Sequence, residues 1–319
     1  MEKRRLGNSD LDVPVITLGG NVYGWTLSEA DTFHQLDRSL EAGLNFIDTA
    51  DVYSRWAPGH KGGESETILG KWFAKSGRRK DVILATKVGI DMGDGKQGLK
   101  AKYIEQAVEA SLERLQTDYI DLYQAHKDDK ETPLDETLNA FDKLVKAGKV
   151  RFIGASNYDG SRLTEAQESS AKHSIAGFVS LQPHYNLMER QPFESDLLPV
   201  VKKYNLGVIP YFALAAGFLT GKYRSTEDAA NAARGKMVGK YLNDRGFTVV
   251  AALDPIAKEY NSTPARVSLA WLIAQPGVTS AIASATNDKQ LDDLIEATKL
   301  KLNPDAIKTL NEVSAPVAA

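Results

Sequence analysis

Apolar and polar residues follow two rhythms along this chain. Eight short runs are rich in Val, Ile, Phe and Tyr with little polar alternation, which is typical of parallel strands covered on both faces. Longer segments between them, such as 99–115, 133–148 and 288–300, carry apolar residues at helical spacing. The eight runs are 15–20, 45–50, 82–89, 119–126, 150–157, 178–186, 206–214 and 278–285.

Eight strands, each followed by helical sequence, predict an α/β fold, a (β/α)8 TIM barrel formed by residues 1–319 as one domain. Residues 4–15 predict an N-terminal β-hairpin that turns at Asn8 and Ser9. We expect this hairpin to plug the floor of the barrel. The long stretch between strands 7 and 8, residues 215–277, predicts extra helices. Part of it, 221–246, is rich in Gly and charge and predicts a mobile loop. Further helical sequence is expected at the C-terminus.

Composition and charge exclude several classes of protein. The absence of cysteine removes disulfides, thiol nucleophiles and thiolate metal sites. The net charge of −3 gives no field that would attract nucleic acid or an anionic membrane, and the basic cluster at 75–80 is interpreted as a solvated loop. No apolar stretch approaches the ~18 residues of a membrane span, and no secretion signal is apparent. We therefore expect a cytoplasmic protein.

One glycine motif has to be weighed against the barrel. "GDGKQG" at 93–98 matches the dinucleotide-binding pattern G-x-G-x-x-G and lies between a predicted strand and a predicted helix. In that fold the first glycine stands at the tip of the strand, and an acidic residue ends the next strand. Here three residues intervene, and the next strand ends in "QAH". A flexible turn is therefore the preferred interpretation.

Polar side chains close several of the apolar runs. Asp48, Lys87 and His126 end the second, third and fourth strands, and Tyr53 lies on the loop after Asp48. Alone, a histidine after a strand is more often structural, and a Lys–Asp pair can be a simple ion pair. Together at the C-terminal rim of a barrel, where barrel enzymes place their chemistry, the four predict a catalytic site.

The four residues suit the protonation of an oxygen. A phenol has a pKa of about 10, and we expect the ammonium of Lys87, held by Asp48, to lower the pKa of Tyr53. His126 would orient a bound carbonyl. The set contains no nucleophile or electron source, so a cofactor must complete the reaction. A metal-dependent hydrolase would need clustered histidines, whereas His34, His60, His126, His173 and His184 are scattered, so no metal is predicted.

At this point the chain resembles the aldo-keto reductase superfamily, in its bacterial and potassium-channel-β-like branch. The resemblance spans nearly the whole chain and rests on motifs that occur in order: "DTADVY", "GGESETILG", "ATKVG", "SLERLQTDYIDLYQAH", "GKVRFIGASNY", "LQPHYNLMER" and "GFLTGKY". It implies NAD(P)H-dependent reduction of an aldehyde or ketone by hydride transfer from nicotinamide C4. It also implies that Tyr53 is the proton donor, tuned by Lys87 and Asp48, and that His126 positions the carbonyl.

The resemblance also implies a cofactor site. Ser156, Asn157 and Gln182 would hold the carboxamide, Tyr211 would stack on the nicotinamide, and the stretch from Phe212 to Lys222 would wrap the pyrophosphate. Residues assigned to the cofactor are Asn21, Asp48, Ser156, Asn157, Gln182, Tyr211, Phe212, Leu214, Gly217, Leu219, Gly221, Lys222, Arg234, Ser284, Thr286, Lys289, Gln290 and Asp293. Arg234 would close over the phosphates.

Three departures from the family pattern affect the cofactor site. Phe212-Ala213 replaces a frequent Ser-Pro, and Leu294 replaces an adenine-contacting Asn. A basic residue that commonly reads the 2′-phosphate is replaced by Ser284 or Thr286, depending on the branch compared. Lys289, one turn further, could supply the missing charge. NADP(H) is therefore the preferred cofactor and NAD(H) the alternative.

The substrate is the least determined part of the function. Trp25, Trp56, Tyr53 and His126 are assigned to the substrate pocket, although either tryptophan could instead be a packing residue. In the family that the chain resembles, a long C-terminal loop often shapes substrate choice, so the short tail after the final helix suggests an open, permissive pocket. Its small-molecule carbonyl substrate is left open, with bulky ketones and sugar-like carbonyl compounds among the candidates. "GGESE" at 62–66 is interpreted as a helix cap, with Glu64 and Glu66 near a helix N-terminus. The alternative function is a nicotinamide-sensing regulatory or partner-binding protein with weak reductase activity.

Overall fold

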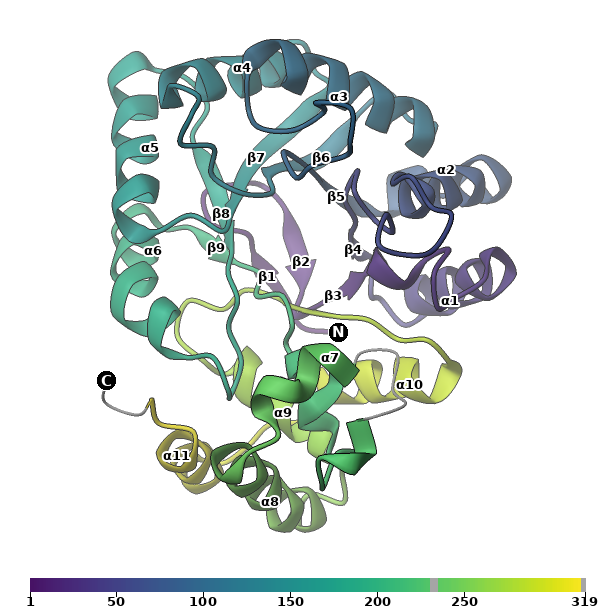
Figure 1. The fold of residues 1–319 in the computed structure, drawn as a ribbon, viewed down its shortest axis with the longest axis vertical. Coiled ribbons are helices and arrows are strands. Elements are labelled where there is room, and N and C mark those ends of the chain that lie inside the picture. Colours follow the sequence, from purple (N-terminus) through teal and green to yellow (C-terminus); the bar gives the residue numbers. More distant parts are fainter. Residues whose placement is uncertain (230–234, 317–319) are drawn as a thin grey trace.

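Eight parallel strands form the centre of the molecule in a computed structural model that describes residues 1–229 and 235–316 (Figure 1). Backbone N–H groups of Thr279 and Ile282 donate to the carbonyl oxygens of Val208 and Pro210, at 2.8 and 2.9 Å, and join the two ends of the sheet. The predicted (β/α)8 barrel is confirmed. In sheet order the strands are β10 (Ala281–Ala283), β3 (Ile16–Gly19), β4 (Phe46–Asp48), β5 (Ile83–Val88), β6 (Ile120–Ala125), β7 (Val150–Ser156), β8 (Phe178–Gln182) and β9 (Gly207–Val208).

Helices surround this barrel, and capping residues set several of their ends. The side chains of Ser28 and Asn287 accept the N–H groups of Asp31 and Gln290 and cap α1 (Glu29–Glu41) and α10 (Asp288–Ala297). Beyond α9 (Pro264–Ile273), the helices α8 (Asp244–Glu259) and α11 (Pro304–Val313) pack on each other as the predicted extra helices (Figure 1). The helices are α1 (Glu29–Glu41), α2 (Glu64–Ser76), α3 (Ala101–Leu115), α4 (Leu134–Lys146), α5 (Gly160–His173), α6 (Leu198–Tyr204), α8 (Asp244–Glu259), α9 (Pro264–Ile273), α10 (Asp288–Ala297) and α11 (Pro304–Val313).

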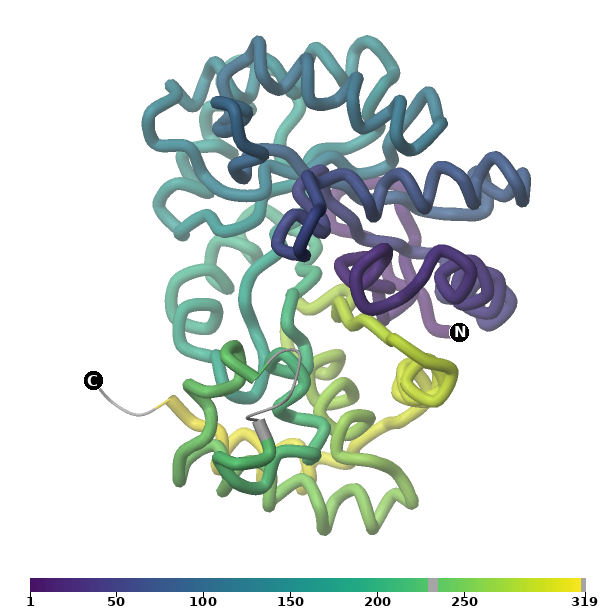
Figure 2. The backbone as a smooth tube through the Cα atoms, turned by 45° about the vertical axis from the view of Figure 1, so that its right-hand side comes forward, coloured from purple at the N-terminus to yellow at the C-terminus, as the bar shows by residue number. Residues whose placement is uncertain are grey.

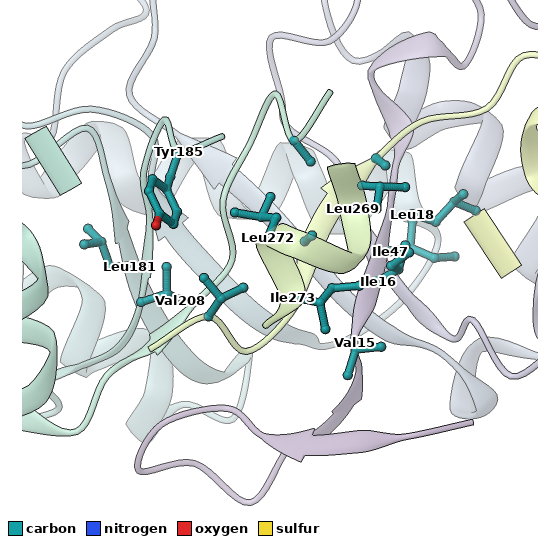
Figure 3. Packing of buried hydrophobic residues seen from close by; sticks show 14 of the residues in the cluster. Val15, Ile16, Leu18, Ile47, Leu181, Tyr185, Val208, Leu269, Leu272 and Ile273 are labelled. Carbon is teal, nitrogen blue, oxygen red and sulfur yellow. The ribbon is translucent and has the colours of Figure 1, made fainter. Parts of the chain in front are cut away.

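The apolar core lies mainly between the strands and the helices. Figure 3 shows Leu269, Leu272 and Ile273 of α9 beside Ile16 and Leu18 of β3. All five side chains are buried, and each contributes roughly 1.5–3 kcal/mol of transfer free energy. Apolar side chains therefore cover the outer face of the strands, as the nearly continuous apolar runs predict.

The predicted hairpin consists of β1 (Lys3–Arg5) and β2 (Asp12–Pro14), paired antiparallel. Leu6, Leu11 and Val13 are buried in a second cluster with inward-facing strand residues such as Phe46 and Leu122. The hairpin thus covers one end of the barrel. Its turn begins at Gly7, which has φ +54° and where a Cβ would lie 2.2 Å from the carbonyl oxygen of Val179, so only glycine fits this close approach.

The segment 221–246 is not simply a mobile loop. Its described parts contain short helical turns, η5 (Glu227–Ala229), α7 (Gly235–Val238) and η6 (Gly239–Tyr241). Arg224 forms a bidentate ion pair with Asp254, at 2.7 and 2.8 Å. Figure 2 follows this green segment on to α8. High Gly and charge content predicted mobility because sequence does not reveal such long-range pairs. Arg234 lies outside the described residues.

The basic cluster at 75–80 is likewise not fully solvated. Arg79 is buried and donates to the Asp121 carboxylate at 2.9 Å, and also to the carbonyl oxygens of Val82 and Tyr119. This side chain stabilises the junction before β5 and is unavailable to an external partner.

The glycine motif "GDGKQG" at 93–98 folds as a turn, as predicted. Lys96 donates its N–H to the carbonyl oxygen of Gly93 at 3.0 Å, and Gly93, Gly95 and Gly98 have positive φ.

Within residues 1–229 and 235–316, none of the helices combines the length and apolarity needed to cross a membrane.

Candidate active site

The C-terminal ends of β4, β5 and β6 bring four of the predicted side chains together. Asp48 is the last residue of β4, Lys87 is next to last in β5, and His126 directly follows β6. The strands are parallel and paired in register, with Asp48 opposite Ala85 and Lys87 opposite Gln124. Their ends therefore meet at one rim, where Tyr53 reaches them from the loop after β4.

The ammonium group of Lys87 joins the others. Its Nζ donates to Asp48 Oδ2 at 2.7 Å, to the carbonyl oxygen of Thr49 at 2.7 Å and to Tyr53 Oη at 3.1 Å. An ammonium has three N–H groups, so this fully buried side chain is saturated. Burial opposes the charge, but Asp48 and Tyr53 outweigh it and raise the pKa of Lys87. Lys87 is thus a cation at neutral pH.

Asp48 is held from its other side by two amides. Its Oδ1 accepts hydrogen bonds from Gln182 Nε2 at 2.8 Å and from Gln124 Nε2 at 3.2 Å. Gln124 is not among the predicted site residues, although the strand period offered a signal. Gln124 lies two residues before His126, and alternate residues of a strand face the same side. The carboxylate is therefore fixed by three partners.

The expectation that Lys87 lowers the pKa of Tyr53 overall is wrong. Burial of the phenol raises its pKa above the ordinary value, and the nearby charge of Lys87 offsets this only in part. The reason is desolvation, because burial destabilises the phenolate by more than the charge of Lys87 stabilises it. Tyr53 consequently keeps its proton at neutral pH. Because Lys87 donates to Tyr53 Oη, the phenol hydrogen is available for another oxygen.

His126 is electrically neutral in this setting. Burial, followed by the charge of Lys87, lowers the pKa of His126 well below its ordinary value. Its ring meets that of Tyr53 edge-on, with centroids 5.9 Å apart. A neutral imidazole can donate one hydrogen bond but is a poor source of a proton. Of the two side chains, Tyr53 is therefore the better acid.

Two tryptophans extend this aromatic surface outward. The ring centroids of Trp56 and Tyr53 are 5.5 Å apart, and those of Trp25 and Trp56 are 5.7 Å apart, both in edge-on contacts. Trp56 is 49% exposed, so it is not a core residue. The two indole rings therefore form an apolar surface beside Asp48, Tyr53, Lys87 and His126, which we call the tetrad. The substrate pocket was predicted at this position.

The interpretation of "GGESE" as a helix start is confirmed, because Gly63 caps α2 and both Glu64 and Glu66 lie in its first turn, but the two carboxylates have different partners. The carboxylate of Glu64 accepts the N–H groups of Lys61 and Gly62, at 2.8 and 3.0 Å, at the start of α2. Glu66 is instead fully buried and accepts from Arg114 Nε at 2.7 Å and from Thr86 Oγ1 at 2.6 Å. Glu66 therefore links α2, α3 and β5 immediately beside Lys87.

Asp51, which the sequence analysis did not single out, lies between Asp48 and Tyr53 in the chain. It is only 2% exposed, and neither carboxylate oxygen has a hydrogen-bond partner among the described residues. Burial, together with the charge of Glu66, raises the pKa of Asp51 to about 8. Asp51 is therefore mostly protonated at neutral pH.

Residues assigned to the nicotinamide end lie together on β7, β8 and the chain after β9. Ser156 Oγ donates to the carbonyl oxygen of Gln182 at 2.8 Å. Tyr211 donates its hydroxyl to Asn157 Oδ1 at 2.8 Å, and Asn157 Nδ2 donates to the carbonyl oxygen of His126 at 2.8 Å. This group therefore adjoins the tetrad through His126.

The proposed phosphate loop has an unusual backbone. Phe212, Ala215, Ala216 and Gly217 all have positive φ, from +48° to +99°, and the N–H groups of Ala215 and Gly217 donate to the carbonyl oxygens of Phe212 and Leu214 at 2.7 and 2.8 Å. A Cβ on Gly217 would lie 3.6 Å from Lys222 Nζ. Three other residues that were assigned to the cofactor lie in the same stretch of chain: Leu214, Leu219 and Gly221. The side chain of Leu219 is wholly buried in the core.

Residues assigned to the adenosine end surround the start of α10. Ser284 Oγ donates to Asn21 Oδ1 at 2.6 Å, and Gln290 Oε1 accepts the N–H of Thr286 at 2.8 Å. Asp293 forms an ion pair with Arg266 Nε at 2.7 Å. Arg266 comes from α9 and is not among the residues predicted from the sequence. Lys289 is exposed.

Across the described part of the chain, no three His, Asp or Glu residues are grouped so that they could hold a metal ion.

The fold is a barrel that gathers an acid, a phenol, an ammonium and an imidazole at the C-terminal ends of its strands. Residues 15–315 match the family model described as Aldo/keto reductase family, and the chain belongs to that family. It is 37% identical to an uncharacterized oxidoreductase, YrpG, of Bacillus subtilis, covering 98% of this chain and 96% of that protein.

Two other relatives extend the comparison. Protein tas of Escherichia coli is 33% identical over 98% of this chain and 97% of its own length. A probable voltage-gated potassium channel subunit beta of rice is 31% identical over 98% and 96%. Together with the family match, these similarities support a carbonyl-reducing oxidoreductase.

Proposed function

We propose that this protein reduces an aldehyde or ketone to the alcohol with NADPH, using Tyr53 as the proton donor. The observation that carries the proposal is the saturated ammonium of Lys87, which donates to both Asp48 and Tyr53. That contact fixes the phenol oxygen and leaves its hydrogen to point at a substrate oxygen. General acid catalysis of this kind contributes about 10²–10⁴-fold to a rate.

The side chains divide the work at the substrate oxygen. Neutral His126 donates a hydrogen bond that orients the carbonyl, and Tyr53 transfers its proton as negative charge develops there. Lys87 stabilises the resulting phenolate, and Asp48 keeps Lys87 in place. When bound, the nicotinamide supplies the hydride that the carbonyl carbon accepts. Solvent then returns a proton to Tyr53.

The residues of the rim suit a dinucleotide. Gln182 directs its Nε2 to Asp48, so we assign its Oε1 to the carboxamide, together with Ser156 and Asn157. Tyr211 would stack on the nicotinamide, and the positive-φ loop at 212–217, with Lys222, would hold the pyrophosphate. Arg234 stays assigned to the same phosphates from the sequence alone.

A panel of carbonyl compounds tests the function. Purified protein should oxidise NADPH, followed by absorbance, with at least one aldehyde or ketone. Because Trp56 is half exposed beside Tyr53, apolar and aromatic carbonyl compounds belong in the panel. If the protein binds NADPH but none of the carbonyl compounds in the panel causes NADPH oxidation, the proposal is contradicted.

That negative result would favour the second candidate, a nicotinamide-sensing regulatory or partner-binding protein. The similarity to a protein named as a probable channel subunit supports it. The complete tetrad favours turnover.

Lys289→Ala is expected to weaken NADPH binding roughly three- to fivefold and NADH binding little, because an exposed charge pair contributes up to about 1 kcal/mol. Lys289 is the exposed basic residue at the start of α10. Dissociation constants for both cofactors provide the measurement, with Lys172→Ala on α5 as the matched control. Equal losses for NADPH and NADH would show that Lys289 does not read the 2′-phosphate.

A further inference from the structure

The loop that follows β8, residues 183–190, holds the chain segment assigned to the nicotinamide and the phosphates. Tyr211 donates its backbone N–H to the carbonyl oxygen of Pro183 at 3.0 Å. The side chain of Asn186 donates to the carbonyl oxygen of Phe212 at 2.9 Å. Phe212 has φ +53°, a conformation that costs a non-glycine residue free energy. The contact with Asn186 thus stabilises a strained residue next to Tyr211.

The same loop reaches the segment that precedes α8. Glu189 donates its N–H to the Asn186 side chain at 3.1 Å, and its carboxylate accepts from Lys240 Nζ at 2.6 Å and from Tyr241 Oη at 3.0 Å. Residues 183–190 are therefore fixed at both sides of the proposed cofactor site and can serve as a rigid support.

One side chain of this support faces Tyr211 directly. The imidazole of His184 stacks on the phenol of Tyr211, with centroids 5.1 Å apart and planes 15° apart. Phe212 meets both rings edge-on, at 5.6 Å from His184 and 5.3 Å from Tyr211. An aromatic ring has two faces, and His184 covers one face of Tyr211. The hydroxyl of Tyr211 is fixed by Asn157, so the ring is restrained at its face and at its tip.

We propose that His184 is a positioning residue that holds the Tyr211 ring flat for stacking on the nicotinamide. This inference rests on the proposed function, which assigns the second face of Tyr211 to the cofactor. It goes further by naming the group behind that ring and by making the ring of His184, rather than its polarity, the feature that matters.

Two observations indicate that the ring matters more than its nitrogens. His184 Nε2 is buried and has no hydrogen-bond partner among the described residues. Burial also lowers the pKa of His184, although Glu189 opposes this, so the imidazole is neutral near pH 7. Phenylalanine should therefore replace it without loss, whereas leucine keeps an apolar side chain but offers no flat face.

The experiment compares His184→Leu with His184→Phe, with His173→Leu at the exposed end of α5 as the matched control. Each variant is titrated with NADPH and with 2′-phospho-ADP-ribose, which lacks only the nicotinamide. We expect His184→Leu to weaken NADPH binding roughly three- to tenfold. Binding of 2′-phospho-ADP-ribose should be unchanged in all variants, and His184→Phe should bind NADPH like the wild type.

Three outcomes would overturn the inference: unchanged NADPH binding by His184→Leu, an equal loss in His184→Phe, or an equal loss for 2′-phospho-ADP-ribose. The third would indicate a general disturbance of the loop. Should His184→Leu fail to fold, His184→Met takes its place. Failure of the proposed function is distinguishable: a wild-type protein that binds NADPH but reduces none of the carbonyl compounds would refute the reductase proposal and leave the binding comparison intact. A wild-type protein that binds no NADPH would overturn the inference as well.

Discussion

Tyr53→Phe is expected to lower kcat/KM for carbonyl reduction by at least about a hundredfold, because it removes the only hydrogen that the phenol can donate. NADPH affinity should change less than about twofold, since the tyrosine hydroxyl is assigned to the substrate and not to the cofactor. Steady-state kinetics with the best carbonyl substrate and an NADPH titration measure the two effects.

The structure indicates that this variant will fold. Lys87 keeps its contacts with Asp48 and with the carbonyl oxygen of Thr49 and loses one acceptor, at a cost of about 1–3 kcal/mol. Tyr204→Phe, whose hydroxyl meets Glu168 on the surface, is the control. Wild-type turnover in Tyr53→Phe would remove Tyr53 from the role of proton donor and leave His126 as the candidate.

Asp51→Asn is expected to stabilise the folded protein, increasingly so as the pH rises. The pKa of Asp51 is about 8 in the folded state, against an ordinary value of 3.8. Between these values the folded state keeps a proton that the unfolded state has released. The free energy of unfolding of the wild type therefore falls as pH rises through this window, by up to about 1.4 kcal/mol per unit from this group.

Asparagine has no proton to lose, so the variant should lack this slope. The two proteins should be similar below about pH 3, where Asp51 is mostly protonated in both states, and should differ by several kcal/mol above about pH 8. Denaturant unfolding across this range measures the difference, with exposed Asp118→Asn as the control. Glu66, Arg114 and Lys87 are the charged groups that act on Asp51 and are unchanged. Parallel curves for wild type and Asp51→Asn would refute the assignment.

Much of the fold follows from local pattern. Eight apolar runs without alternation predict buried parallel strands, and the rim follows because parallel strands end on the same side. Asp48, Lys87 and His126 could be found in this way, since each ends a strand. Gln124 does not end a strand, and only the two-residue period of β6 indicates that it faces the same side as His126.

Other features depend on partners distant in the sequence. Glu66 is near a helix start, which suggested a cap, but its partner Arg114 is 48 positions away. Arg79 belongs to a run of basic residues, yet Asp121 draws it into the interior. The segment 221–246 has a composition that suggested mobility, but its residues Lys240 and Arg224 form ion pairs with Glu189 and Asp254. Composition reports average exposure, whereas pairing of opposite charges reverses it for individual residues.

The sequence by itself determined the barrel, its family and the identity of the acid, phenol, ammonium and imidazole at the rim, because periodicity and strand ends are local properties. Only the tertiary structure decided the protonation of Tyr53, Lys87 and His126, and of the neighbouring Asp51. Burial raises the pKa of Tyr53 and Asp51 and lowers that of His126, and the cost of desolvation depends on everything packed around a group rather than on its neighbours in the chain.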